Sequence, residues 1–270
     1  MRMTRMLSFG LEDRVAVVTG GSSGIGLATA RLLLRGGARV AICGRNAARL
    51  ETAGRSLGEE AGSDRIYINC CDVLDADGIG SFASGVATQL GRADILVNNA
   101  GEGRVSTFAA TDDEAWRAEL ELKFFSVIRP TRAFLPQIEQ SDAGSIVCVN
   151  SLLARQPEPH MVATSAARAG VLNMVRSLAT ELAPRRVRVN AVLIGLVESG
   201  QWRRRYTTQA APDETWEAWT SALAAQKGIP LCRLGKPEEA AHAIIFLASP
   251  LASYTTGTFI DVSGGHSHHV

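Results

Sequence analysis

A glycine-rich stretch near the N-terminus restricts the fold of this chain more than any other feature. Residues Val15–Thr19 have the composition of a buried strand, and helical spacing follows over 27–35. Between the two segments stand Gly20, Gly24 and Gly26. Glycines permit a tight turn and a close approach of the backbone to a pyrophosphate, which the free N–H groups and dipole of a helix N-terminus attract. The stretch predicts a phosphate-binding turn, and the alternative is a turn with a structural role only.

Short β-branched runs alternate with longer helical patterns along the rest of the chain. The runs that predict strands are 15–19, 39–43, 65–69, 95–97, 145–149, 187–192 and 258–262. Helical spacing occurs over 27–35, 77–90, 113–135, 163–182 and 237–247. Such alternation requires crossover connections, and it predicts an α/β fold with a doubly wound parallel sheet covered on both faces. No repeat or linker interrupts the pattern, so residues 11–265 are expected to form a single domain.

Three segments are expected to depart from this pattern. Residues 1–10 predict a flexible N-terminus, and the histidine-rich tail 266–270 predicts a loose end or a subunit contact. Residues 196–233 are long for a connection and predict a lid of two short helices. The lid aromatics at helical spacing are Trp202, Tyr206, Trp216 and Trp219. They favour an apolar or ring-containing small-molecule substrate, and the alternative is that they only dock the lid on the body.

Composition argues against several classes of function. The formal net charge of the 270 residues is +1, which gives no argument for binding nucleic acid or a membrane surface. No run is apolar and long enough to predict a signal peptide or a membrane span. The five cysteines have no metal-ligand spacing, and the tail histidines form no closed ligand set. We therefore expect free thiols, no bound metal and a cytoplasmic location.

Further motifs occur in an order typical of one family. They are Cys-Asp-Val at 71–73, Asn-Asn-Ala-Gly at 98–101, Val-Arg-Val-Asn at 187–190 and Tyr-Thr-Thr-Gly at 254–257. Together with the turn Thr-Gly-x-x-x-Gly-x-Gly, they make the chain resemble the short-chain dehydrogenase/reductase family over 11–265. The resemblance implies a Rossmann fold, a nicotinamide cofactor, a carbonyl or alcohol substrate, and a homotetramer or homodimer.

The resemblance places the cofactor-binding residues along these motifs. They are Gly20, Ser22, Ser23, Gly24, Ile25, Gly26, Arg45, Asp72, Val73, Asn99, Ala100, Gly101, Arg168, Gly195, Val197 and Ser199. An NAD-selective site usually has an acidic residue about 20 positions beyond the glycine turn, where this chain has Gly44. The next residue, Arg45, could pair with a 2′-phosphate through its planar guanidinium. NADP(H) is therefore favoured over NAD(H), and the alternative is a solvated Arg45 with loose selectivity.

The family's proton-transfer residues are altered in this chain. In the family a serine orients the substrate oxygen, a tyrosine donates the proton, and a lysine holds the nicotinamide ribose with support from an asparagine. By this resemblance Ser151 is retained, whereas Thr164, Arg168 and Lys123 replace the tyrosine, lysine and asparagine. A threonine hydroxyl is too weak an acid to act as tyrosine does, and arginine does not lose its proton. Lys123 beside Arg168 is expected to have a lowered pKa and to donate the proton, unless water does so or Lys123 points away.

These substitutions leave three functions open. The first is an NADP(H)-dependent oxidoreductase of the short-chain type with an altered proton-transfer set. The others are a catalytically silent NADP(H)-binding scaffold or sensor, and a nonredox enzyme that uses the same pocket. His160 is a further candidate acid or base, although loop histidines are more often exposed.

Overall fold

Seven parallel strands form one sheet in the computed structural model, which describes residues 8–268. The strands are β1 (Val15–Thr19), β2 (Arg39–Gly44), β3 (Ile66–Cys70), β4 (Ile95–Asn98), β5 (Ser145–Ser151), β6 (Arg188–Ile194) and β7 (Phe259–Val262). Their order is β3-β2-β1-β4-β5-β6-β7, and all neighbouring pairs are parallel. The prediction of a doubly wound parallel sheet is confirmed.

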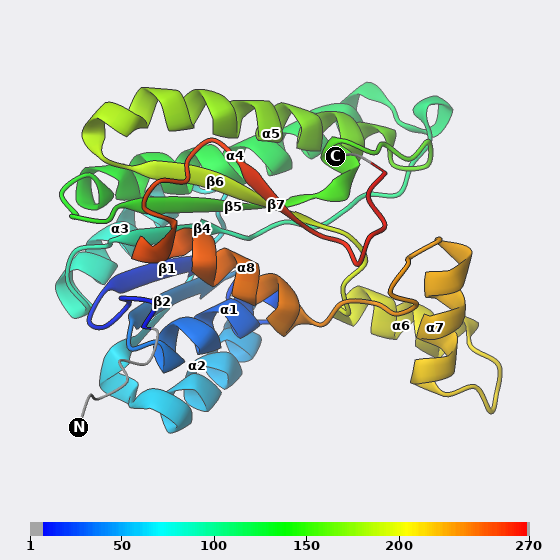
Figure 1. Cartoon of the computed structure of the whole chain (residues 1–270), viewed down its shortest axis with the longest axis horizontal. Coiled ribbons are helices and arrows are strands. Elements are labelled where there is room, and N and C mark those ends of the chain that lie inside the picture. Colours follow the sequence, from blue (N-terminus) through cyan, green and yellow to red (C-terminus); the bar gives the residue numbers. More distant parts are fainter. Residues whose placement is uncertain (1–7, 269–270) are drawn as a thin grey trace, which may run out of the picture.

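Helices cover both faces of the sheet. They are α1 (Gly24–Arg35), α2 (Ala47–Ala61), α3 (Ala76–Gln89), α4 (Asp113–Ile138), α5 (Val162–Leu182), α6 (Gly200–Gln209), α7 (Trp216–Gln226) and α8 (Pro237–Ala248). In Figure 1, α4 and α5 lie on one side of the sheet and α1, α2 and α8 on the other. Val15 and Val17 pack into the core on the side of α4 and α5, whereas Ala16 and Val18 pack into the core on the side of α1, α2 and α8. Because successive strand side chains point to opposite faces, one apolar run contributes to two cores.

Most elements lie within a few residues of their predicted bounds. β1 has the predicted bounds, and β3 begins and ends one residue later than 65–69. Helix α2 was not among the segments with predicted helical spacing. Its N-cap is Asn46, whose side chain accepts a hydrogen bond from the Arg49 N–H at 2.8 Å. Capping of this kind starts a helix even where few of its residues are buried and apolar.

Two further expectations concern the N-terminal segment 1–10 and the absence of a membrane-spanning helix. Residues 1–7 of the segment expected to be flexible lie outside the described residues. Within residues 8–268, no helix combines the length and the apolar character needed to cross a membrane.

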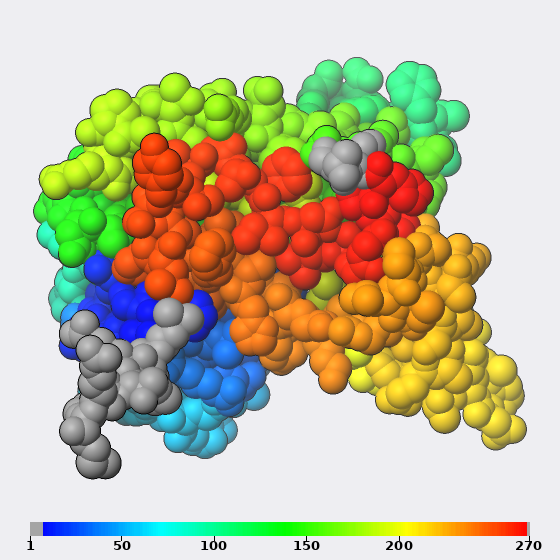
Figure 2. All heavy atoms as spheres, in the orientation of Figure 1, coloured from blue at the N-terminus to red at the C-terminus, as the bar shows by residue number. Residues whose placement is uncertain are grey.

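Residues 196–233 contain the two expected short helices, α6 and α7, which project from the body in Figures 1 and 2. Their aromatic rings pack on one another. The ring centroids of Trp202 and Trp219 are 6.4 Å apart, and those of Tyr206 and Trp216 are 5.5 Å apart. This packing holds α6 against α7, and it involves all four aromatic residues of the segment.

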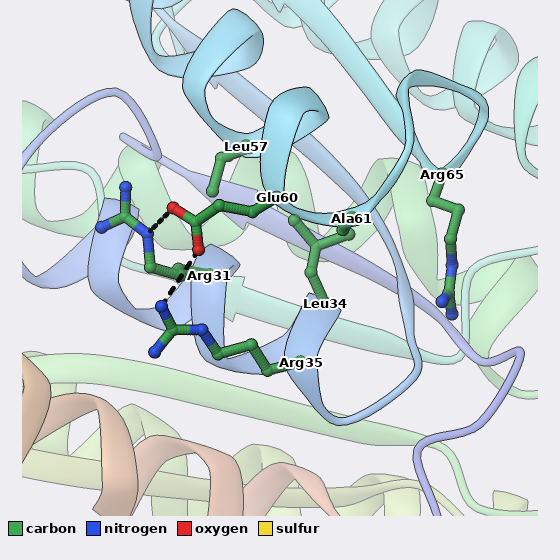
Figure 3. A pocket seen from close by; sticks show the side chains of 7 residues that line it. All are labelled: Arg31, Leu34, Arg35, Leu57, Glu60, Ala61 and Arg65. Carbon is green, nitrogen blue, oxygen red and sulfur yellow. Dashed lines mark hydrogen bonds and ion pairs between the residues drawn. The ribbon is translucent and has the colours of Figure 1, made fainter.

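A hollow of about 310 Å³ lies between α1 and α2. Glu60 in its wall accepts a hydrogen bond from Arg31 Nε at 2.6 Å and pairs with Arg35 Nη2 at 3.1 Å (Figure 3). The hydrogen bond from Arg31 lowers the pKa of Glu60. The Glu60 carboxylate thus forms ion pairs with both of these arginines. These ion pairs connect α1 to α2.

The turn after β1 is bound to the end of β4 by hydrogen bonds. Asn99 Nδ2 donates to the carbonyl oxygens of Thr19 and Gly20, at 2.9 and 3.2 Å. The N–H groups of Asn99 and Ala100 both donate to Thr19 Oγ1 at 3.0 Å. A Cβ on Gly26 would lie 2.4 Å from the Gly20 oxygen and 2.5 Å from Asn99 Nδ2. Only glycine lets α1 begin this close to the point between β1 and β4 where the strand order reverses.

Replacing Gly26 by alanine is expected to lower the free energy of unfolding by about 1–3 kcal/mol, because the new Cβ displaces the turn. Urea or guanidinium titration measures the change. The matched control is Gly80→Ala in the exposed face of α3, where no atom lies within 4 Å of the new Cβ. That control should be neutral or stabilise the protein by about 0.5–1 kcal/mol. Equal effects at both positions would contradict the role given to the close contact.

Candidate active site

A cavity of about 750 Å³ lies at the carboxyl ends of the central strands. Open parallel α/β sheets bind ligands at this edge, beside the point where the strand order reverses. The predicted cofactor-binding residues that line it are Gly20, Ser22, Ser23, Gly24, Ile25, Arg45, Asp72, Val73, Asn99, Ala100, Gly101, Arg168, Gly195, Val197 and Ser199. Gly26 does not line the cavity and instead lies against Asn99 beneath the turn. Motifs that are far apart in the sequence therefore meet in one cavity.

The N-terminus of α1 faces this cavity. The helix begins at Gly24, and the side chain of its N-cap Ser23 makes no capping hydrogen bond. The N–H groups of the first turn therefore lack this partner and can bind an anion in the field of the helix dipole. Gly20 and Gly24 have φ angles of +66° and +54°, which favour glycine. The turn has the local geometry of a pyrophosphate site.

Two arginines line the cavity beyond the end of β2. Gly44 occupies the position of an acidic residue, and its missing side chain leaves room beside Ser22. Arg45 is exposed and lines the cavity, and Arg49 in the first turn of α2 lines it as well. Arg49 was not predicted as a cavity residue, because helix α2 was not predicted either. Two guanidinium groups therefore lie beside a space to which Gly44 contributes no side chain.

A second cavity, of about 250 Å³, adjoins the first. The residues that line both are Ser151, Arg168, Ile194, Gly195 and Trp202. Ser151 is the last residue of β5, and its Oγ accepts a hydrogen bond from the Leu153 N–H at 3.2 Å. Its own hydroxyl proton is therefore available for donation. Molecules bound in the two cavities would meet beside Ser151 and Arg168.

Arg168 stands in the shared wall and is held from α5. Its Nη1 donates to the Val149 carbonyl at 3.0 Å, and its own carbonyl accepts from Asn150 Nδ2 at 3.0 Å. Its Nε is buried and makes no hydrogen bond to any described residue. Burial lowers the pKa of Arg168 to about 10, and the charge of Glu119 opposes that shift. Arg168 is therefore a cation at neutral pH with a donor left over for a ligand.

Thr164 connects the second cavity to the protein interior. It is buried in the first turn of α5 and lines the cavity. Its Oγ1 forms a hydrogen bond with Oε1 of Glu119 on α4, and the Arg104 N–H donates to the same Oγ1 at 3.2 Å. The hydroxyl thus joins a buried carboxylate to the space where a substrate would lie.

Lys123 extends inward, with a side chain that is 1% exposed and with Nζ 2.7 Å from Glu119 Oε1. The alternative that Lys123 points away from the site into solvent is wrong. Burial lowers the pKa of Lys123, the bond to Glu119 opposes this shift, and the charge of Arg168 adds to it. Lys123 lines neither cavity, however, which corrects the expectation that it donates a proton directly to a substrate. Glu119 and Thr164 lie between Lys123 and the second cavity.

Glu119 is the candidate that the sequence analysis missed. Its side chain is 3% exposed, and its Oε1 contacts both Thr164 Oγ1 and Lys123 Nζ. A buried carboxylate is costly unless it is paired, and here Lys123 and Arg168 supply positive charge. The spacing of four residues between Glu119 and Lys123 was the available signal, since such side chains share a helix face.

The second cavity also revises the expectation of an apolar substrate. Trp202 lines both cavities, whereas the other three lid aromatics pack within the lid. Tyr206, Trp216 and Trp219 therefore give no support for an apolar substrate. His160 lines this cavity with a side chain that is 49% exposed, and its Nε2 lies 3.0 Å from Glu158 Oε2. It is thus partly exposed and also part of the cavity wall.

Comparison with known proteins agrees with this geometry. The family model described as enoyl-(acyl carrier protein) reductase matches residues 20–267. A 3-oxoacyl-[acyl-carrier-protein] reductase from Thermotoga maritima is 35% identical over 255 residues, which are 94% of this chain and 98% of that protein.

Solved structures are similar over nearly the whole chain. A short chain oxidoreductase from Pseudomonas aeruginosa PAO1, described as NADPH-bound and as containing an atypical catalytic center, is 63% identical with a TM-score of 0.92. That match covers 96% of this chain and 98% of the other. L-sorbose reductase from Gluconobacter frateurii, complexed with NADPH and L-sorbose, is 32% identical with a TM-score of 0.92, over 98% of this chain and 100% of the other. The chain therefore belongs to the short-chain dehydrogenase/reductase family of oxidoreductases.

Proposed function

We propose that this oxidoreductase uses NADP(H) to reduce a carbonyl group, or to oxidise the corresponding alcohol, with a rebuilt proton-transfer set. The observation that carries the proposal is a chain of buried contacts. It runs from Lys123 Nζ to Glu119 Oε1 and on to Thr164 Oγ1, which lines the second cavity. Such a chain can deliver a proton to a substrate although the family tyrosine is absent.

The residues of the first cavity fit the cofactor. The glycine turn and the N-terminus of α1 suit the pyrophosphate, and Arg45 with Arg49 suits a 2′-phosphate. The unpartnered Nε of Arg168 suits ribose hydroxyls. When bound, NADPH supplies the hydride for the reduction, and the protein supplies orientation and the proton.

Ser151 and Arg168 would stabilise charge on the substrate oxygen. The Ser151 hydroxyl accepts from Leu153 and so is oriented to donate into the cavity. The cationic Arg168 lies in the same shared wall. Donors and charges fixed in advance around a developing oxyanion lower the barrier without reorganisation at the moment of reaction.

The proton would reach that oxygen through Thr164. As Thr164 Oγ1 gives its proton to the substrate oxygen, it accepts one from Glu119, and Glu119 in turn accepts one from the ammonium group of Lys123. The bonds formed and broken balance, and no free alkoxide is required on a hydroxyl that is a weak acid. Lys123 is left neutral, which its buried position beside Arg168 favours. A water molecule as the proton donor is the alternative.

Location and assembly belong to the same proposal. All five cysteines are unpaired thiols, which supports a reducing compartment such as the cytoplasm. Leu120 and Phe125 on α4 are partly exposed apolar side chains, which supports a homodimer or homotetramer.

The choice of cofactor is tested at Arg45. Arg45→Ala is expected to weaken NADPH binding about tenfold, because a charge-assisted bond to the 2′-phosphate is lost, and to change NADH binding less than about twofold. Calorimetric titration of both nucleotides measures this. Arg55→Ala, on an exposed part of α2 outside the cavity, is the matched control and should change neither affinity. Equal losses for both nucleotides would contradict recognition of the phosphate by Arg45.

The proton route is tested at Lys123 and Glu119. Lys123→Met alone leaves Glu119 buried without its ion-pair partner at a cost of about 3–5 kcal/mol, so Lys123→Met/Glu119→Gln is made beside it. The double variant is expected to lower kcat about 10²–10⁴-fold while the Kd for NADPH stays within about twofold. Loss of NADPH absorbance measures turnover, and the exposed Lys236→Met is the control.

Two results would overturn the proposed function. One is a wild type without turnover on a broad carbonyl panel, beside an active Thr164→Tyr/Arg168→Lys variant, which would favour the silent NADP(H)-binding scaffold or sensor. The other is failure to bind either nucleotide, which would exclude the scaffold as well.

The pH dependence of reduction should report Lys123. The protonated amine is the active form, so kcat is retained at low pH and lost as pH rises through the pKa. Burial lowers that pKa below 10.5, so the loss is expected at lower pH than for a free lysine. Lys123→Arg keeps the charge but does not titrate in this range, and its residual rate should show no such alkaline loss. The same alkaline limb in Lys123→Arg would assign it to another group.

A further inference from the structure

Polar side chains from three separate segments meet in the wall of the second cavity. Gln156 and Glu158 come from the loop between β5 and α5, Lys227 follows α7, and His266 belongs to the C-terminal tail. The proposed proton route uses none of them. They therefore need an explanation of their own.

The tail reaches this cavity because of two consecutive glycines. Gly264 and Gly265 have φ angles of +66° and +84° and turn the chain back after β7. The Gly264 carbonyl accepts from the Leu231 N–H at 3.2 Å, and a Cβ on Gly265 would lie 2.9 Å from Pro230. In Figure 2 the red C-terminal segment lies against the orange segment that follows α7. The described part of the tail is therefore packed, which corrects the expectation of a loose end.

The position of His266 is fixed from both sides. Its N–H donates to the Ser263 carbonyl at 3.2 Å, and two residues later the His268 N–H donates to Gln156 Oε1 at 3.1 Å. The tail thus bridges back to the loop that carries Glu158. His266 is held as a part of the cavity wall.

His266 has a polar atom without a protein partner. The residue is 7% exposed, and its Nδ1 is buried without a hydrogen bond to any described residue. Burial lowers the pKa of His266, so the ring is neutral at neutral pH. A buried polar atom left unpaired costs about 1–3 kcal/mol, and native proteins pair such atoms with protein, water or ligand. His266 lines the cavity, so a ligand there can contact its ring.

The charges of Glu158 and Lys227 beside His266 are paired with each other. Lys227 Nζ lies 3.3 and 3.1 Å from the two carboxylate oxygens of Glu158, and His160 contacts the same carboxylate. The guanidinium of Arg205 lies 4.7 Å from the ring centroid of Trp202. Within the described residues, no group of His, Cys, Asp and Glu side chains is arranged to bind a metal. The wall beside His266 therefore offers hydrogen-bond donors and acceptors together, while Arg168 and Arg205 add positive charge elsewhere in the cavity.

This mixture selects among classes of ligand. A hydroxyl group can donate to Glu158 or His266 and accept from Lys227, so each polar atom of the wall can be satisfied. A carboxylate would face the Glu158 carboxylate. An aliphatic chain would bury the polar wall without replacing the hydrogen bonds of its water, and sites of this kind reject such analogues strongly.

We propose that Glu158, Lys227 and His266 form a hydroxyl-binding subsite, and that the substrate is a polyhydroxylated carbonyl compound or its alcohol. The proposal rests on the proposed function, because Ser151 and Arg168 border the same cavity and would hold the reacting carbonyl. A volume of about 250 Å³ suits a compact molecule of the monosaccharide class.

The test compares substrates of equal length with and without hydroxyls. Reduction by NADPH is measured for a panel of ketohexoses, for hexan-2-one and for 5-oxohexanoate. The best ketohexose is expected to exceed hexan-2-one at least about tenfold in kcat/KM, since each hydroxyl bond contributes about 1 kcal/mol. A wild type that prefers hexan-2-one or 5-oxohexanoate to every ketohexose overturns the subsite.

The variants locate the effect at His266. His266→Phe is expected to lower kcat/KM for the ketohexose about tenfold, mainly through KM, with less than about twofold change for hexan-2-one. Gly265→Ala shifts His266 without altering it and should show the same selective loss. His242→Phe, on the exposed face of α8, is the matched control. Equal effects of His266→Phe on both substrates overturn the subsite.

A binding measurement separates this proposal from the proposed function. Hexitols are titrated calorimetrically into the NADPH-loaded protein, where no redox reaction is available to them. Binding by wild type that weakens about tenfold in His266→Phe supports the subsite, even if no carbonyl compound is reduced and the proposed function fails. Absence of hexitol binding by an NADPH-loaded wild type overturns the subsite and leaves the proposed oxidoreductase standing.

Discussion

The close approach of the glycine turn to the end of β4 is the contact on which the rest of the site depends. Asn99 holds the carbonyls of Thr19 and Gly20, and Gly26 lets α1 begin directly beneath them. This contact opens the cavity at the reversal of strand order and aims the start of α1 into it. Gly44, Ser151 and Gly195 then reach the cavity at the carboxyl ends of parallel strands along the same edge, and Arg168 reaches it from α5.

The substitutions around the catalytic position form a consistent electrostatic unit. A buried carboxylate at Glu119 requires positive partners, and Lys123 and Arg168 supply them. In return, Glu119 bonds Thr164, which makes a weak acid part of a longer chain of proton donors and acceptors. Restoring a tyrosine alone would leave this carboxylate and its cations in place, so the residues are best understood and changed together.

The strands were predictable because parallel strands buried on both faces are continuous apolar runs. Helix α2 was not, since its buried face consists of only Leu50, Ala53 and Leu57 and its start depends on the Asn46 cap. Residues in ordered motifs were predictable as cavity residues because motif spacing reflects local geometry. Arg49 was not predicted as a cavity residue, because it lies in the unpredicted helix α2. The fold and most of the lining of the first cavity were thus predictable from the sequence, whereas the contacts around the second cavity were not.

The sequence by itself determined the fold class and the glycine turn, because these depend on periodicity and on neighbours close in the chain. The exchange of the catalytic residues was visible through the resemblance to the family. Only the tertiary structure decided that Lys123 points inward, that Glu119 joins it to Thr164, and that His266 returns to the cavity. Each of these outcomes depends on contacts between segments far apart in the sequence. Their burial and pairing energies arise only when α4, α5 and the tail pack together.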